Sequence, residues 1–429
     1  HEPHDNTFGK FLVKSNANAA LCTSCHQKTG YVSSAHGTSN AAYTADGAAI
    51  TVGEYSCRNC HMAHGASSAQ AYILRGAEEN TCYNCHGSPA LPGAKSIKNL
   101  FAKASKHPVE TAAGVHINPE LDGANFKLGK RHSECWDCHN PHRAKTGTHA
   151  TPGNTIGNAL LGAWGVEPNY AAGAWLAAAS FTRQVFNDAT NYKEYQLCFK
   201  CHSYYAYGIT PPAGYTDQSV EYNPNNRSAH PVRNSANTQT GSVAPQALAT
   251  AQMSSPWNTG ANMGNQAMTC SDCHGSDVTS DPKGPHGSAS QHMLKGPKRY
   301  WPKNASGTLW TLDDVKNNKN SWSTNLFCVN CHPLYTNGTW TNNVHERSNH
   351  QRTNIYCITC HVVVAHGAKR SRLIGYKSDP TPYNYGGTGT YDKLVIDGFR
   401  KASSRTGYSD NNCNSKATGC HTGSGTFEP

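Results

Sequence analysis

The sequence lacks any long hydrophobic run. A membrane-spanning helix needs about 20 consecutive, predominantly apolar residues. The most apolar segment of this chain, residues 159–181, is interrupted by Glu167, Pro168 and Asn169. The sequence therefore predicts no membrane span.

Apolar side chains are scarce along the whole chain. They make up 37% of its 429 residues, and the chain has 39 glycines and only five methionines. A chain of this length would ordinarily form two or three domains, each with a core of aliphatic and aromatic side chains. We therefore expect something other than aliphatic side chains to fill part of the interior.

Cysteine, in contrast, is abundant, with 18 residues. The sequence begins with His1 and not with methionine, which is typical of an exported chain whose signal peptide has been removed. Because the first residue is not a cysteine, we expect no lipid anchor. Eighteen cysteines in an exported chain would by default form nine disulfides.

The spacing of the cysteines argues against that default. Eight pairs have two residues between the cysteines and a histidine directly after the second one. These pairs are Cys22/Cys25, Cys57/Cys60, Cys82/Cys85, Cys135/Cys138, Cys198/Cys201, Cys270/Cys273, Cys328/Cys331 and Cys357/Cys360. The histidines that follow them are His26, His61, His86, His139, His202, His274, His332 and His361. No cysteine is left outside such pairs except Cys413 and Cys420.

A histidine at that one position has a specific chemical meaning. Neither a disulfide nor a zinc site requires it, whereas a c-type haem does. Two cysteines form thioethers with the vinyl groups of the haem, and the adjacent imidazole becomes an axial ligand of the iron. The eight units therefore predict eight covalently bound c-type haems.

The last pair has a different spacing. Six residues separate Cys413 from Cys420, and His421 follows. One interpretation is a disulfide beside an unrelated histidine. The other is a ninth haem, because a longer loop can still place both sulfurs at the vinyl groups. We adopt the second interpretation and expect nine haems.

Fifteen further histidines could supply the second axial ligand of each iron. Methionine is the usual alternative, but five methionines are too few for nine haems. A lone histidine is ordinarily a surface or capping residue, so the demand for nine ligands is what favours coordination here. The expected second ligands are His36, His64, His107, His132, His142, His230, His286 and His366, with His345 and His350 competing for the ninth place. His116 is in reserve, and we expect His149 and His292 to line surfaces or haem propionates.

Neighbouring residues support this ranking. His36, His64, His286 and His366 precede a glycine, and His107 and His230 precede a proline. We expect a small residue or a fixed turn to let the backbone approach a flat porphyrin closely. His64 lies too near His61 in sequence to reach the far face of the same haem, so it is expected to serve a neighbouring one.

The predicted fold is mostly irregular coil with short α-helices at the haem units and little β-structure, organised around a stacked chain of haems. A longer helix is expected near residues 171–181. A row of stacked haems makes one continuous core, so residues 1–429 are expected to form a single unit. Residues 203–269 contain no cysteine and are rich in tyrosine, proline and asparagine, which suggests a haem-free insertion.

Two stretches carry a resemblance to a known family. CRNCHMAHG with ILRGAEENTCYNCHG, and KHPVETAAGVH with RHSECWDCHNPH, resemble the large multihaem c-type cytochromes that metal-reducing bacteria use for extracellular electron transfer. CSDCHGSDVTSDPKGPHGS and CITCHVVVAHGAKRSRLI extend the likeness into the second half. Some members of that group polymerise into filaments, and others are periplasmic carriers or terminal reductases at the cell surface.

The resemblance implies an electron conduit, extracellular or at the cell surface, whose partners are other copies of itself, redox-partner cytochromes and external acceptors such as metal oxides. The alternatives are a monomeric periplasmic carrier, a terminal metal reductase, or a nitrite- or hydroxylamine-converting enzyme. The last of these needs an open iron position and often carries Cys-x-x-Cys-Lys, which this sequence lacks. Propionates would offset much of the formal charge of +10, and we expect no nucleic-acid partner.

Overall fold

The structure is a computed structural model of the whole chain. Its described residues are 1–28, 30–45, 47–65, 71–110, 133–208, 210–235, 248, 250–259, 265–334, 355–384, 396–401, 413–417, 421–422 and 428.

The helices are short. The α-helices are α1 (Ala20–Thr23), α2 (Val52–Tyr55), α3 (Glu78–His86), α4 (Cys135–Cys138), α5 (Glu194–Phe199), α6 (Tyr204–Tyr207), α7 (Gln218–Glu221), α8 (Leu312–Lys316), α9 (Trp322–Asn325) and α10 (Cys357–Cys360). The 3₁₀ helices are η1 (Ala17–Ala19), η2 (Tyr31–Ser33), η3 (Ser56–Asn59), η4 (Ala71–Ile73), η5 (Lys98–Ala102), η6 (Asn158–Leu160), η7 (Thr250–Gln252), η9 (Cys270–Asp272), η10 (Gln291–Met293), η11 (Lys319–Ser321), η12 (Phe327–Asn330) and η14 (Ser371–Leu373).

The strands form small antiparallel sheets. They are β1 (Ala42–Ala45), β2 (Ala48–Thr51), β3 (Ser105–Lys106), β4 (Trp164–Asn169), β5 (Ser180–Val185), β6 (Ser228–Ala229), β7 (Gly287–Ser288), β8 (Gly367–Ala368), β9 (Ile396–Lys401), β10 (Cys413–Ala417) and β11 (His421–Thr422). The pairs are β1–β2, β3–β7, β4–β5 and β6–β8, and β9, β10 and β11 make a three-stranded sheet.

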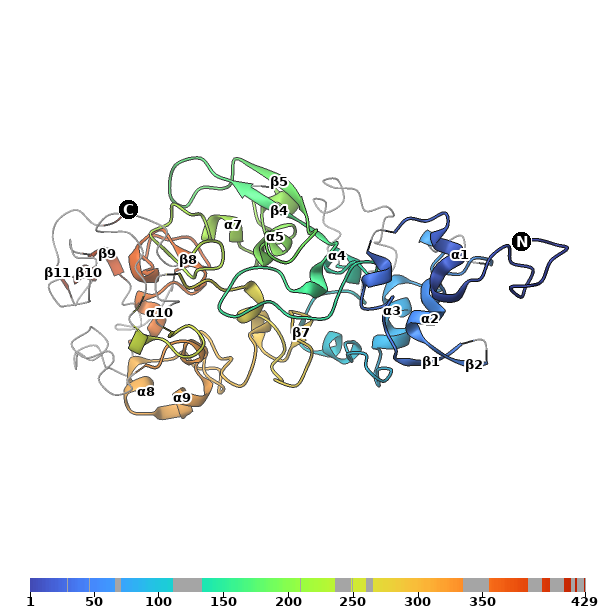
Figure 1. Cartoon of the computed structure of the whole chain (residues 1–429). Helices are drawn as coiled ribbons and strands as arrows, with labels where there is room; N and C mark the ends of the chain where they lie inside the picture. The colour runs from blue at the N-terminus through green and yellow to red at the C-terminus, as the bar shows by residue number, and fades with distance from the viewer. Residues whose placement is uncertain are drawn as a thin grey trace.

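The molecule is elongated, and the chain progresses along its long axis. Figure 1 shows α1 to α3 at one end, α4, α5 and β7 in the middle, and α8, α10 and β9 at the other end. The N-terminal segment extends away from the body beyond α1. Consecutive parts of the chain therefore follow one another in space as they do in sequence.

Buried apolar side chains form several small clusters and not one large core. One cluster gathers Val166, Phe199 and Val232 with their neighbours, and another surrounds Trp310. Cysteines of the haem motifs pack against each of these clusters. This arrangement agrees with the low apolar content of the sequence.

The predicted fold class is confirmed: the described chain is mostly coil with short helices and small antiparallel sheets. The helix expected near residues 171–181 is wrong. That segment is the connection between β4 and the start of β5, and its backbone forms bends and turns. Its alanines favour a helix, but Pro168 and Gly173 interrupt the helical backbone, and pairing of β4 with β5 satisfies the flanking hydrogen bonds instead.

The described part of residues 203–269 contributes to the interior. Tyr222, Val232, Trp257 and Met268 are buried members of the cluster around Phe199. None of the helices in the described part of the chain has the length and the apolar composition that a membrane crossing requires.

Candidate haem-binding sites

Each described Cys-x-x-Cys-His unit forms about one helical turn. The amide of the motif histidine donates to the carbonyl of the first cysteine, for example from His139 to Cys135 at 2.9 Å and from His274 to Cys270 at 2.9 Å. Residues four apart lie on the same face of a helical turn. The turn therefore presents the first sulfur and the imidazole to one side, as thioether attachment with axial ligation requires.

Five motif histidines face a second histidine from a distant part of the chain. Their ring centroids are 5.9 to 6.2 Å apart, whatever the angle between the ring planes. The pairs are His61 with His142, His86 with His36, His139 with His286, His202 with His107, and His274 with His366.

This separation has a simple geometric meaning. A metal–imidazole bond is about 2.0 Å long and the ring centre lies roughly 1 Å beyond the nitrogen, so two imidazoles on opposite sides of one metal have centres roughly 6 Å apart. The five pairs match that spacing. Burial lowers the pKa of His142 to about 4 and that of His286 to about 3, which keeps these imidazoles neutral, as ligands must be.

A sixth pair is indicated by electrostatics. Burial and then the neighbouring His230 lower the pKa of His332 to about 4. His230 therefore lies near enough to the seventh motif, counting motifs along the sequence, to influence the pKa of its histidine. All the second histidines of these six pairs belong to the expected ligands.

The pairing follows an alternating rule. The third, fifth and seventh motifs face a histidine that precedes them in sequence: His36, His107 and His230. The second, fourth and sixth motifs face a histidine that follows them: His142, His286 and His366. Each partner histidine follows, in the sequence, a motif that is two places before or after the motif it faces. Neighbouring sites are therefore built from overlapping parts of the chain.

The sites also form one ordered row. Thiols of successive motifs lie close enough to influence each other's pKa. These neighbours are Cys22 and Cys57, Cys60 and Cys85, Cys82 and Cys135, Cys138 and Cys198, Cys198 and Cys270, Cys273 and Cys331, and Cys328 and Cys357. The spatial order of the eight motifs is therefore their order in the sequence.

Cys25 departs from the arrangement expected for a motif cysteine. The other fifteen cysteines of the eight regular motifs are partly buried and line one continuous cavity, whereas Cys25 is exposed and does not line it. Cys22 and His26 of the same motif do line the cavity. The first motif lies at the end of the row, and in the described part of the chain its Cys22 neighbours Cys57 of the second motif. The structure thus places one of the two expected thioether sulfurs of this motif at the surface, and attachment at Cys25 stays a prediction.

Most candidate ligands have their outer ring nitrogen fixed by a backbone carbonyl. Nδ1 of His86 lies 3.0 Å from the oxygen of Lys95, and Nδ1 of His139 lies 3.0 Å from that of Ala159. His61, His274, His361, His36 and His230 are held in the same way. Such a bond selects the tautomer that leaves Nε2 for a metal and orients the ring. At His286, by contrast, Nδ1 is buried without a hydrogen-bond partner.

A local backbone module occurs three times and was not foreseen from the sequence. In it, the motif histidine pairs with a later residue in an isolated antiparallel bridge: His61 with Leu74, His274 with Leu294, and His361 with Ile374. The residue two places before the bridge partner has positive φ and offers its carbonyl to Nδ1. These residues are Tyr72, His292 and Arg372. The recurring letters ILRG, MLKG and LIG could have revealed the repeat.

Two short ladders hold the second ligands in pairs. β3 with β7 joins the segments of His107 and His286, and β6 with β8 joins those of His230 and His366. The amide of His230 donates to the carbonyl of His366 at 2.9 Å. Four candidate ligands from distant parts of the sequence are thus fixed by two backbone pairings.

The glycines after these histidines also allow close approach to a neighbouring backbone segment. A Cβ on Gly287 would lie 1.9 Å from the carbonyl oxygen of Leu100, and one on Gly37 would lie 2.1 Å from that of Tyr31. The close approach is therefore to another backbone segment. At Gly65, the reason is its positive φ of 71°.

Two glutamates that the sequence analysis missed connect neighbouring motifs. Glu78 accepts hydrogen bonds from the amides of Cys135 and Trp136, each at 3.2 Å. Glu194 accepts from the amide and the hydroxyl of Ser271, each at 2.8 Å. Each glutamate lies four residues before the first cysteine of its own motif and caps the start of the next motif's helix. The shared pattern Glu-x-x-x-Cys-x-x-Cys-His was the available signal.

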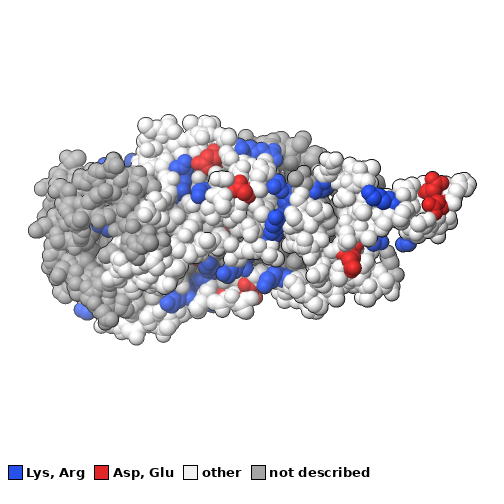
Figure 2. All heavy atoms as spheres, in the orientation of Figure 1, with Lys and Arg blue, Asp and Glu red and all other residues white. Residues whose placement is uncertain are grey.

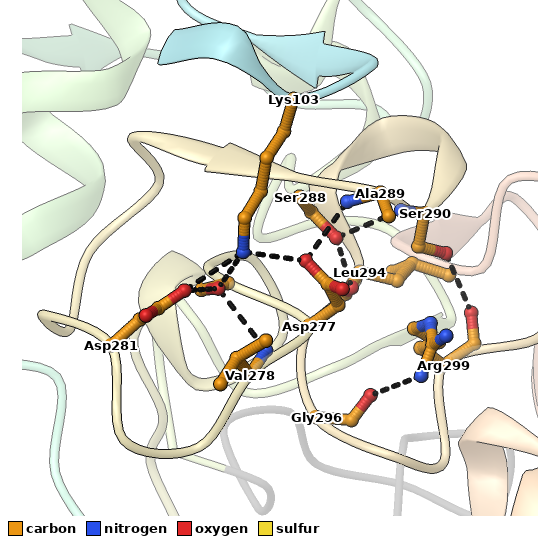
Figure 3. A network of polar contacts seen from close by, with 11 residues as sticks. Lys103, Asp277, Val278, Asp281, Ser288, Ala289, Ser290, Leu294, Gly296 and Arg299 are labelled. Atoms are coloured by element: carbon orange, nitrogen blue, oxygen red, sulfur yellow. Dashed lines mark hydrogen bonds and ion pairs between the residues drawn. The ribbon is translucent and has the colours of Figure 1, made fainter. Parts of the chain in front are cut away.

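A polar network fixes the segment that carries β7 (Figure 3). Nζ of Lys103 lies 2.9 Å from Asp277 and 2.8 Å from Asp281, and it donates to Ser276 at 2.7 Å. Burial opposes the charge of Lys103, but these hydrogen bonds outweigh it and raise its pKa. The network holds the ladder of β3 and β7, and with it His107 and His286.

The remaining histidines have varied positions. His64 stacks on His1 with ring centroids 5.5 Å apart, and it faces no motif histidine in the described part of the chain. His149 is partly buried and hydrogen-bonds to Asp272 and Thr269, each at 3.1 Å. It is thus part of a polar network. His292 offers its carbonyl to His274, as described above.

Some expected residues lie outside the described part of the structure. These are His116, His132, His345, His350 and Cys420, and the side chains of Cys413 and His421. The ninth haem and the second ligands of His26 and His361 therefore stay predictions.

The cavity that the motif cysteines line also receives the candidate ligands. Its volume is about 5,230 Å³, and all eight described motif histidines line it. A pocket for one small molecule typically encloses about 300–1,000 Å³. The cavity is thus large enough for a row of several flat cofactors, and its paired neutral imidazoles and nearby cysteines fit c-type haem.

The comparisons with known proteins agree with this geometry. Residues 48–91 match the family model described as doubled CXXCH motif. No curated protein and no solved structure matches the chain. The match supports a multihaem c-type cytochrome with covalently bound haem that serves electron transfer.

Proposed function

We propose that the chain carries electrons through nine bis-histidine c-type haems and acts as an extracellular conduit or filament subunit that delivers electrons to external acceptors such as metal oxides. The observation that carries the proposal is the row of five imidazole pairs at the spacing of axial ligands, in the order of the motifs. A haem iron with two axial histidines exchanges one electron between its ferric and ferrous states.

The paired histidines also favour an electron carrier over an enzyme. Catalysis at a haem iron requires an open coordination position for a substrate. The five imidazole pairs at about 6 Å have the separation that one ligand on each side of an iron would give. Their Nδ1 atoms are mostly bound to carbonyls, which keeps the rings in place and the metal position closed to other ligands.

The N-terminal segment supports association between copies. It extends away from the body in Figure 1, and its Phe8, Phe11 and Val13 are exposed. His64 stacks on His1 of this segment and faces no motif histidine in the described part of the chain. A contact between unlike ends of two copies generates a filament when the rotation between copies does not close into a ring. We propose that His64 coordinates a haem of a neighbouring copy.

Electron microscopy of the native cell-surface fraction tests the filament. We expect fibres that bind antibodies against this chain, and His64→Ala should abolish them and turn one haem high-spin. His149→Ala is the matched control, because His149 faces no motif histidine. Isolated particles with haem ligation unaffected by dilution would instead identify a monomeric periplasmic carrier or a terminal metal reductase.

The positively charged side chains on the face shown in Figure 2 offer a surface on which a redox partner could bind. Lysines and arginines gather over the middle of that face, and acidic side chains are few and scattered. Such groups can pair with haem propionates or with the acidic surface of a partner cytochrome. A rate of reduction by a partner cytochrome that falls with added salt would support pairing with the acidic surface of that partner.

A further inference from the structure

One candidate ligand has an unusual hydrogen-bond partner. Nδ1 of His366 lies 2.5 Å from Oε2 of Glu221, a residue of α7 whose side chain is fully buried. Oε1 of the same carboxylate accepts a hydrogen bond from the hydroxyl of Tyr383 at 2.7 Å. Most of the other described candidate ligands contact a neutral backbone carbonyl instead.

The backbone is built to bring these groups together. The carbonyl of Glu221 lies so close to β8 that a Cβ on Gly367 would be 1.9 Å from its oxygen. The side-chain amide of Asn226 donates to that same carbonyl at 2.8 Å. Glycine beside the ligand and the pairing of β6 with β8 therefore fix the distance between Glu221 and His366.

The neighbouring sites use weaker acceptors. In the seventh site, Nδ1 of His230 lies 2.6 Å from the carbonyl of Ala365. In the fifth site, His107 is hydrogen-bonded to the carbonyl of Pro285. A carboxylate carries a full charge, and hydrogen bonds to ionised acceptors are roughly twice as strong as neutral ones.

A stronger acceptor on the outer nitrogen raises the basicity of a metal-bound imidazole. A more electron-donating axial ligand stabilises the ferric state, and hydrogen bonding around the ligands is one of the means by which a protein adjusts haem potential. The same axial pair therefore gives a lower potential when a carboxylate replaces a carbonyl as the acceptor.

We propose that Glu221 is a positioning residue that sets the reduction potential of the haem at Cys270 and Cys273. Through His366, it keeps this potential below the value that a backbone carbonyl would allow. The inference rests on the proposed function, because it requires His274 and His366 to be the two axial ligands. An electron that passes along the row then meets a site that is harder to reduce than its two neighbours, which limits the rate of passage.

The test is a spectroscopic redox titration of the full-length, haem-loaded protein with Glu221→Gln. Glutamine keeps the shape and an acceptor oxygen but removes the charge. We expect one of the one-electron steps to move to higher potential, so that the ferrous-to-ferric ratio of that haem at a fixed potential rises about tenfold, which equals about 59 mV for a one-electron couple. All haems should stay low-spin.

A second variant predicts the opposite sign. Tyr383→Phe removes the hydroxyl that draws charge from the carboxylate, so the same haem should become harder to reduce. Glu167→Gln is the matched control, because Glu167 accepts hydrogen bonds from Tyr195 and Gln196 and contacts no candidate ligand. That control should leave the titration unchanged.

The outcomes separate this inference from the proposed function. An unchanged titration in Glu221→Gln with every haem low-spin, or a high-spin haem in that variant, overturns the potential-setting role alone. If the reduction potential of the haem shifts equally and in the same direction in Glu221→Gln and Tyr383→Phe, the potential-setting role is also overturned. If His366→Ala leaves every haem low-spin, His366 is not a ligand, and the proposed ligation fails together with the inference.

Discussion

His139 and His286 lie with their ring centroids 6.2 Å apart and their planes 22° apart, although one belongs to the first half of the chain and the other to the second. The carbonyl of Ala159 holds Nδ1 of His139, and the ladder of β3 and β7 places His286. The two rings have the separation expected for a pair of axial ligands, and this leads to a direct test.

Replacing His286 with alanine should leave all haems attached and turn one haem high-spin, because attachment depends on cysteines and spin state on the second ligand. Electron paramagnetic resonance and resonance Raman spectra measure this change. His149→Ala is the control: it should lower stability by about 1 kcal/mol through loss of partly buried hydrogen bonds and leave every haem low-spin. An unchanged spectrum in His286→Ala would show that His286 is not a ligand.

Intact-mass spectrometry of the purified protein should show nine haem additions and no disulfide. The expectation rests on nine cysteine pairs, each followed by a histidine, with no cysteine left over. Eight additions with Cys413 and Cys420 joined by a disulfide would show that the last pair forms a disulfide and binds no haem. Cys413→Ser together with Cys420→Ser should remove one haem mass if nine haems are bound.

Glu134→Gln should stabilise the protein in mildly alkaline solution. Burial and then the adjacent Glu78 raise the pKa of Glu134 to about 9, against an unperturbed value of 4.5. A carboxyl with a raised folded pKa contributes stability below its unfolded pKa and loses it as the pH rises toward the folded value. We expect the variant to be more stable at pH 8 by about 1–3 kcal/mol and equal to the native protein at pH 4.

Denaturant midpoints, followed by haem absorbance at both pH values, measure this difference. Glu54→Gln is a control of opposite sign, because Glu54 is exposed and hydrogen bonds from Thr51 lower its pKa. That variant should give no stabilisation at pH 8. If the Glu134→Gln protein is less stable than the native one at pH 8, the carboxyls of Glu134 and Glu78 are not buried next to each other.

Lys103→Met should weaken the ladder of β3 and β7. It removes the cation from between Asp277 and Asp281, at an expected cost of about 1 kcal/mol after solvent screening. The hydrogen bonds from Lys103 lower the pKa of both aspartates despite burial, so the effect should be present above pH 4 and disappear as they are protonated. Hydrogen exchange of the β3 and β7 amides reports the change.

Lys319→Met provides the comparison, because Lys319 pairs with Asp313 at a site where the lysine is 51% exposed. The loss of stability in Lys319→Met should be smaller than the loss in Lys103→Met. Equal protection of β3 and β7 in Lys103→Met and the native protein would show that the network does not hold the ladder.

The attachment sites could be predicted from the sequence because their chemistry is local. Two cysteines and a histidine within five residues form one helical turn in any context, as at Cys135 and His139. The exposure of Cys25 could not be predicted, because it depends on the position of the first motif at the end of the row.

The coil-rich fold class followed from the scarcity of apolar residues. The absence of a helix at 171–181 did not, because the pairing of β4 with β5 overrides the helical preference of its alanines.

The partner of each motif histidine was decided by the tertiary structure. Five of the histidines that precede glycine or proline lie beside a motif histidine, whereas His64 does not, and their spacing contained no information on which motif each would face. His366 meets His274 and not the nearby His361, because the ladder of β6 and β8 brings distant backbone segments together. The same holds for Glu221, whose contact with His366 exists only where long-range backbone pairing excludes water and fixes both groups.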